Sequence, residues 1–95
     1  MKEKMKNLLS LLYKKLPEED CENAMDLINY DEYGIALELI CTQLYEREIS
    51  ITNDAKKIII DLIIDMELDL ELADGIRVEI DGKVYNVGNY IDFCT

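Results

Sequence analysis

The sequence lacks histidine and tryptophan and has a single proline. The absence of histidine excludes Ser–His and Cys–His nucleophilic pairs and the common histidine-containing zinc sites. No GxxxxGK[ST] or GxGxxG stretch occurs, which argues against a glycine-rich phosphate loop. No apolar run reaches the length of about eighteen residues that spans a bilayer, so we predict no transmembrane helix.

Cysteine is also scarce. The three cysteines, Cys21, Cys41 and Cys94, are odd in number and widely spaced, and no CxxC pair is present. This pattern predicts neither a disulfide framework nor a thiolate metal site. Polar residues interrupt the apolar positions of the first segment, so no signal-peptide core is expected. Together these features predict a cytoplasmic protein without a cofactor or a structural metal.

Basic residues are few and unevenly placed. The chain has 21 acidic and 10 basic residues, a net charge of −11. Five of the bases precede Pro17, so residues 18–95 alone carry a net charge of −15. Such a field repels nucleic acid and anionic membranes and attracts basic proteins. We therefore expect no direct contact with nucleic acid or membrane; solubility is the simpler explanation of the charge.

Carboxylates are plentiful, but no pair of them has the spacing of a particular chemistry. The acidic run near Gly75 resembles a calcium loop only superficially, because Leu70 occupies the first ligand position and no glutamate follows at the required distance. A glycosidase-type pair requires an apolar cleft that raises one pKa, and no pair stands out. The sequence therefore predicts neither a metal site nor an enzyme.

The spacing of apolar residues predicts four helices, over about 2–15, 18–29, 31–46 and 53–66. Pro17 ends the first, and three carboxylates suit the positive end of the second. Asp31 is the expected N-cap of the third helix, and Thr52 or Asn53 that of the fourth. We expect the third helix to bury Ile35, and its glycine, Gly34, to permit close packing against a neighbour.

After Met66 the pattern changes to an alternation of acidic and apolar residues, which favours an edge strand. Two further alternating runs flank Asp81-Gly82 and predict a β-hairpin over about 76–87, with Val84 and Val87 on its apolar face. The predicted fold is therefore mainly α: one domain, 1–95, built as a compact bundle of about four helices with a C-terminal β-hairpin.

Acidic residues and tyrosines gather in three places: the junction 30–33, the segment 45–48, and the stretch 61–74, which holds six acids and no base. Each has a structural explanation, as a helix cap, a helix end or a solvated face. Together they suit an interface with a basic protein, because tyrosine offers rigid contact area and carboxylates pair with arginine. The candidate contact residues are Asp26, Tyr30, Asp31, Glu32, Tyr33, Tyr45, Glu46, Glu48, Asp65, Glu67 and Asp69.

The stretch 16–51, LPEEDCENAMDLINYDEYGIALELICTQLYEREISI, resembles the MafI-like family of bacterial immunity proteins. That family pairs an LP-(acidic)-A-x-(D/E)-L-I segment with (D/E)-(Y/W)-G-x-A-L-E-x-(L/I)-C-x-x-L-Y. The pattern falls on Leu16, Pro17, Ala24, Asp26, Leu27, Ile28, Glu32, Tyr33, Gly34, Ala36, Leu37, Glu38, Cys41, Leu44 and Tyr45. The chain after Met66 departs from the family pattern, which finishes in a helix.

The resemblance implies a small helical cytoplasmic protein that neutralises a cognate toxin domain, often a nuclease, of a polymorphic or contact-dependent growth inhibition system. The acid excess suggests that an acidic face covers the toxin's basic active site. An acidic adaptor or nucleic-acid mimic with no toxin partner is the alternative. A homodimer formed through the edge of the hairpin is a further possibility that the sequence leaves open.

Overall fold

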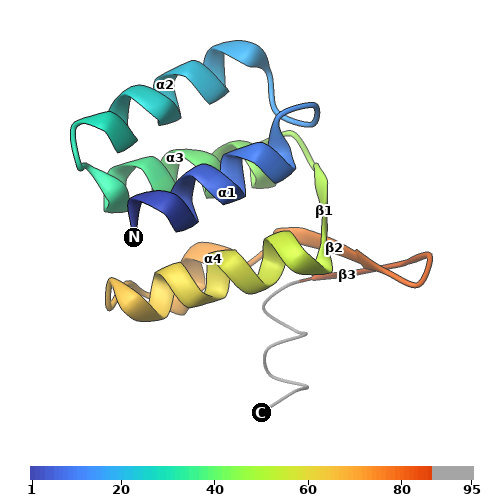
Figure 1. The fold of residues 1–95 in the computed structure, drawn as a ribbon. Helices are drawn as coiled ribbons and strands as arrows, with labels where there is room; N and C mark the ends of the chain where they lie inside the picture. The colour runs from blue at the N-terminus through green and yellow to red at the C-terminus, as the bar shows by residue number, and fades with distance from the viewer. Residues whose placement is uncertain (87–95) are drawn as a thin grey trace.

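The computed structural model describes residues 1–86, in which the helices α1 to α4 precede a C-terminal hairpin (Figure 1). The predicted mainly helical fold with a C-terminal hairpin is confirmed, although the predicted hairpin residue Val87 lies outside the described residues. The elements in chain order are α1 (Lys2–Leu12), α2 (Glu18–Asn29), α3 (Tyr33–Glu46), β1 (Ser50–Thr52), α4 (Asn53–Asp65), the 3₁₀ helix η1 (Leu70–Ala73), β2 (Arg77–Ile80) and β3 (Lys83–Asn86).

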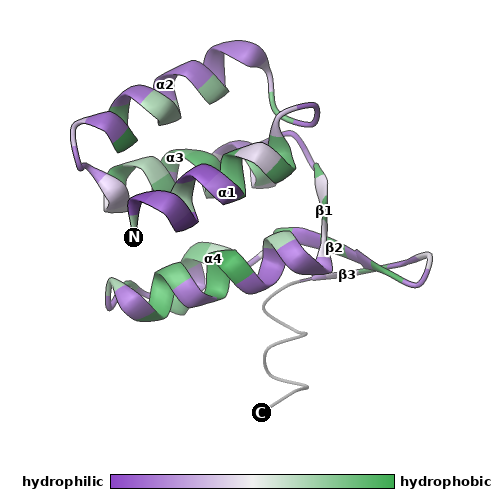
Figure 2. Cartoon of the chain, in the orientation of Figure 1, coloured by the Kyte–Doolittle hydropathy of each residue, from purple (hydrophilic) through white to green (hydrophobic). Residues whose placement is uncertain are grey.

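The helices α1 to α4 pack around one core. α2 packs mainly on α3, while α1 lies against both α2 and α4 (Figure 1). In Figure 2, α2 is largely hydrophilic, whereas α3 and α4 show more hydrophobic residues. The core contains residues from every helix and from β1 and β2; its largest fully buried side chains are Met5, Leu8, Leu12, Ile28, Leu37, Ile40, Leu44, Ile51, Ile59, Leu62, Ile63 and Ile76.

The sheet contains one strand, β1, that the sequence did not predict. β1 pairs with β2 in parallel, and β2 pairs with β3 antiparallel, giving the order β1-β2-β3. No strand was predicted before α4, because the three residues of β1 are too few to show an alternating pattern. Asp81 and Gly82, with φ of 52° and 80°, form the predicted two-residue turn between β2 and β3.

The predicted apolar face of the hairpin is wrong at Val84. The two-residue turn places Lys83 opposite Ile80, and therefore Val84 opposite Glu79. Since side chains alternate between faces along a strand, Val84 lies on the face away from the core and is 56% exposed. Tyr85 lies opposite the buried Val78 instead.

Several boundaries also differ. α1 ends at Leu12 rather than 15, because the amides of Lys15 and Leu16 both donate to the Leu12 carbonyl and close the helix with a turn. α4 ends at Asp65, one residue early. The alternating stretch after Met66 forms η1 instead of an edge strand; the Asp69 carboxylate accepts the Glu71 amide at 2.9 Å and starts this helix.

The start of α3 differs most from the prediction. The helix begins at Tyr33, with Glu32 and not Asp31 at its N-cap. Ile35 is 53% exposed, because the buried stripe of α3 is formed by residues one position further along, from Ala36. A Cβ added to Gly34 would have no heavy atom within 4 Å. No neighbouring helix therefore packs so closely against Gly34 that a glycine is required there.

Three helices end in the same way, with an acidic residue in a left-handed conformation. Asp31, Glu48 and Glu67 have φ of 61°, 53° and 54° and follow the last residues of α2, α3 and α4 by two positions. In each case the next amide donates to a carbonyl five residues back, as in a Schellman motif; the pairs are Glu32 to Leu27, Ile49 to Leu44 and Leu68 to Ile63. Glycine or asparagine is the usual residue at this position.

Replacing Glu67 by glycine is expected to raise the free energy of unfolding by about 1 kcal/mol, because a left-handed conformation costs an L-residue about that much. The change also removes a negative charge from the negative end of α4. Asp31→Gly is the matched control: it relieves the same strain but removes the partner of Lys2 and Tyr33. Urea denaturation of both variants should show a clearly smaller gain, or a loss, for Asp31→Gly. Equal gains would contradict this account.

Candidate protein-binding surface

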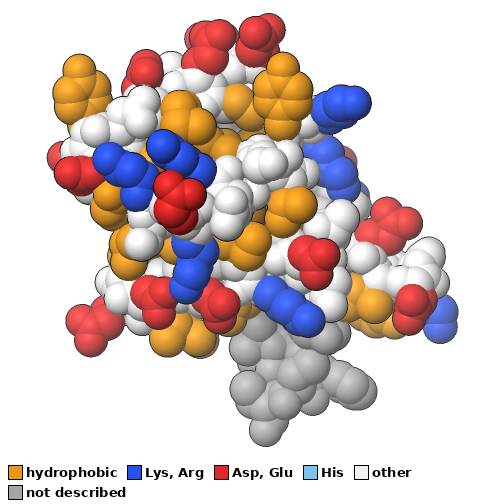
Figure 3. Space-filling view, in the orientation of Figure 1, with side chains coloured by type: hydrophobic (Ala, Val, Ile, Leu, Met, Phe, Trp, Pro, Cys, Tyr) orange, Lys and Arg blue, Asp and Glu red, His pale blue; other side chains and the backbone are white. Residues whose placement is uncertain are grey.

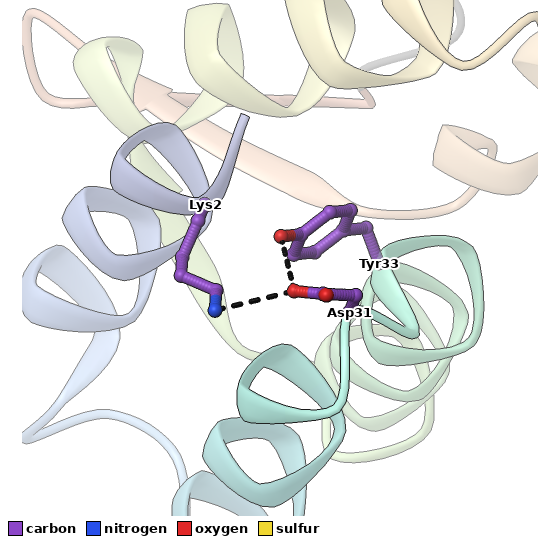
Figure 4. Close-up of polar contacts among 3 residues, drawn as sticks. All are labelled: Lys2, Asp31 and Tyr33. Atoms are coloured by element: carbon purple, nitrogen blue, oxygen red, sulfur yellow. Dashed lines mark hydrogen bonds and ion pairs between the residues drawn. The ribbon is translucent and has the colours of Figure 1, made fainter.

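The lysines of α1 neutralise two of the predicted contact residues. Lys2 Nζ lies 3.2 Å from Asp31 Oδ1, and Lys4 Nζ donates to Asp65 Oδ2 at 2.8 Å. The Tyr33 hydroxyl also donates to Asp31 Oδ1, at 2.7 Å, so that one carboxylate oxygen serves both residues (Figure 4). The Tyr33 hydrogen bond, with Lys2 beside it, lowers the pKa of Asp31 below its ordinary value.

The first predicted cluster, residues 30–33, therefore has in part a structural role. Asp31 and Tyr33 connect the α2–α3 junction to the beginning of α1, and their polar groups are already paired. Asp26, Tyr30 and Glu32 remain exposed, and the Tyr30 side chain reaches 80%. Exposed pairs such as Lys2–Asp31 add little stability, so their main effect here is to remove the charge of the carboxylate from the acidic surface.

The second predicted cluster lines a groove. The groove lies between the C-terminal end of α3 and the hairpin and has a volume of about 670 Å³. It is lined by Tyr45, Glu46, Glu48, Gly75, Arg77, Val84, Tyr85 and Asn86, which we call the acidic groove. Three of its apolar or aromatic side chains are well exposed: Tyr45 at 58%, Val84 at 56% and Tyr85 at 42%.

Gly75 forms the floor of the acidic groove beneath Tyr45. Its φ of +83° is left-handed, and the Tyr45 ring occupies the place that a Cβ would take. The Gly75 amide also donates to Asn86 Oδ1 at 3.3 Å, which ties the floor to β3. A glycine is required here both for the backbone conformation and for the close approach of the ring.

The acidic groove lies beside two segments of the chain that lack basic residues. Neither 31–46 nor 58–76 contains a lysine or arginine. Within the groove, Arg77 Nη2 donates to Glu48 Oε1 at 3.1 Å, whereas Glu46 has no ion pair among residues 1–86. η1 packs against α3, and its exposed Glu71 and the following Asp74 extend the acidic surface. The remaining predicted residues, Glu67 and Asp69, lie before η1 and do not line the groove.

Sequence reasoning missed the contribution of the hairpin to this site. Gly75, Arg77, Val84 and Tyr85 line the acidic groove, but the sequence only indicated that they belong to strands or to a turn. Their position beside α3 depends on packing between segments far apart in the chain. Gly75 itself was the available signal in the sequence, since glycine is the usual residue where another group approaches the backbone closely.

Two features of residues 1–86 concern metal binding and the reactivity of the cysteines. Within 1–86, no group of three acidic or cysteine side chains is arranged to hold a metal ion. Burial raises the pKa of the Cys41 thiol to about 12, and burial together with Asp20 and Glu18 raises that of Cys21, so neither thiol is activated as a nucleophile. A search of the described helices finds none with the length and apolar character needed to cross a membrane.

Seven of the fifteen residues that carry the family resemblance are scaffold residues of the core. Those of the motif that are fully or nearly fully buried are Leu16, Ala24, Ile28, Ala36, Leu37, Cys41 and Leu44, which pack in the core around α2 and α3. They therefore describe a helix pair and not a contact surface. No protein-family model, curated protein or solved structure matches this chain.

Proposed function

We propose that this chain is an immunity protein, which binds a cognate basic toxin domain of the nuclease class and neutralises it by covering its active site. The observation that carries the proposal is the acidic groove, where Tyr45, Tyr85 and Glu46 are exposed and Glu46 has no ion pair within residues 1–86. The resemblance of 16–51 to MafI-like immunity proteins supports the same conclusion.

The proposed mechanism is occlusion of the cationic residues with which a nuclease holds phosphate. The carboxylates of Glu46 and Glu48 would replace the phosphate oxygens and pair with arginine in a bidentate manner. The rings of Tyr45 and Tyr85 would stack on the arginine planes and provide contact area at a small entropic cost. The net charge of −11 would accelerate association with a basic partner.

Arg77 would act from within the acidic groove. It holds the Glu48 carboxylate in place in the free protein, at the end of a helix whose negative dipole would otherwise repel this side chain. An arginine from the toxin would then compete with Arg77 for Glu48 and meet Glu46 without competition. Glu46 is therefore the carboxylate whose replacement tests the proposal most directly.

Reversing the charge of Glu46, by Glu46→Lys, is expected to raise the dissociation constant for the toxin domain encoded beside this gene by about tenfold or more, because like charges across an interface cost several kcal/mol. Glu19→Lys is the matched control, since Glu19 is also exposed but lies on α2. Calorimetry at low and physiological salt measures both variants, together with protection of a nucleic acid substrate from the toxin.

Each outcome decides between the explanations. Absence of binding by the unmodified protein at both salt concentrations would rule out the immunity function and leave the acidic adaptor or nucleic-acid mimic. Equal losses for the two reversals would show that total charge, and not the acidic groove, determines affinity. Binding without protection of the substrate would contradict the occlusion mechanism while preserving the partner.

A further inference from the structure

A second groove lies on another part of the molecule, between α1 and α2. Its volume is about 520 Å³, and it is lined by Lys6, Leu9, Ser10, Tyr13, Glu18, Cys21, Glu22 and Met25, which we call the interhelix groove. Leu9, Cys21 and Met25 give it an apolar floor. Its rim is charged with opposite signs on its two sides: Lys6 on α1, and Glu18 and Glu22 on α2.

The charges of the rim extend along both helices. The segment 1–16 contains five lysines and one acid, and 18–29 contains five acids and no base. Figure 3 shows this face, with acidic side chains over α2 at the top, basic side chains over α1 below, and hydrophobic side chains between them. Lys6, Glu18 and Glu22 have no ion pair within residues 1–86. The rim charges therefore remain available to an external partner.

A protruding aromatic ring stands beside the interhelix groove. Tyr13 follows the last residue of α1 and is 66% exposed, although it lines the groove. A hollow with an apolar floor and a projecting ring thus occur on the same face. Two such surfaces fit each other when related by a two-fold axis, because each ring can enter the hollow of the other copy.

We propose that the interhelix groove is the contact surface of a two-fold symmetric dimer of this chain. Lys6 of one copy faces Glu22 of the other, twice per dimer, and each Tyr13 ring covers the apolar floor of the opposite groove. Residues 30–95, which lie outside both helices, hold fifteen acids and five bases, so pairings through these other surfaces bring like charges together. The two grooves have no lining residue in common, so this contact is independent of the acidic groove.

Charge reversal with complementation tests the contact. Each single variant, Lys6→Glu or Glu22→Lys, places like charges opposite each other at both contacts, and we expect the dimer dissociation constant to rise by about tenfold or more. An equimolar mixture of the two variants should form a mixed dimer. In it, the introduced carboxylate faces the introduced lysine, and the native Lys6 faces the native Glu22. Sedimentation equilibrium at low salt measures the mass of each sample.

Three further variants separate the Tyr13 ring from its hydroxyl, and the interhelix groove from the hairpin edge. Tyr13→Ala should weaken the dimer and Tyr13→Phe should preserve it, since the ring and not the hydroxyl fills the groove. Val84→Glu, on the exposed face of β3, should leave the dimer unchanged. A monomer at the highest soluble concentration, no mixed dimer from the two variants, or loss of the dimer in Val84→Glu alone would each overturn the proposal.

Discussion

Replacing Ile51 by alanine is expected to lower the free energy of unfolding by about 2–5 kcal/mol, the range for removing a large buried aliphatic side chain. Ile51 is the central residue of β1, pairs with Val78 of β2, and is 0% exposed, as is Val78. Its side chain is part of the core, so its truncation leaves a cavity at the point where the sheet meets the core.

Urea denaturation followed by circular dichroism measures this loss. Ile64→Ala is the matched control, because it makes the same chemical change on α4 at a side chain that is 60% exposed. The control should change the free energy of unfolding by no more than about 0.5 kcal/mol. A small loss for Ile51→Ala would contradict the described position of β1, since a residue on a loose connection would bury little.

Replacing Gly75 by alanine is expected to lower the free energy of unfolding by about 2 kcal/mol or more. A left-handed conformation costs an L-residue about 1–2 kcal/mol, and the added methyl must also displace the Tyr45 ring. Because Tyr45 forms one wall of the acidic groove, the same change should weaken binding of the proposed toxin partner.

Gly82→Ala separates the two contributions. Gly82 has a φ of +80°, close to that of Gly75, but its added Cβ would have no heavy atom within 4 Å. The loss in Gly82→Ala therefore measures the backbone strain alone, and the additional loss in Gly75→Ala measures the displacement of Tyr45. Equal losses in thermal denaturation, with equal affinities for the partner, would show that the Tyr45 ring moves aside freely.

The elements with strong local signals were predictable from the sequence. Pro17 separated α1 from α2, and Asp81-Gly82 located the hairpin. β1 was not predictable, because it is only three residues long and its pairing with β2 depends on contacts across the intervening α4. η1 was missed because its alternating residues also satisfy a 3₁₀ turn, which the Asp69 side chain stabilises.

The candidate site was predictable to a smaller extent. Glu46 and Glu48 were predicted as contact residues because carboxylates at the end of a helix oppose its dipole, and Tyr45 because tyrosine beside acids suits an interface. The contacts of Lys2 with Asp31 and of Lys4 with Asp65 were not predictable, since each pair joins α1 to a segment far away in the chain. Charge compensation between distant segments therefore decided which acidic residues remain available to a partner.

The short connection between β1 and α4 has a consequence for the motions of the protein. Thr52 is the last residue of β1 and also the N-cap of α4, and its Oγ1 accepts the amide of Ala55 at 3.2 Å. β1 therefore cannot leave β2 without disturbing the first turn of α4, so these segments form one cooperative unit for local unfolding. The hairpin closes through its own turn and is free of that requirement. If β1 separates from β2, the disturbance would thus spread through α4 into the core. The hairpin residues that line the acidic groove would keep their arrangement.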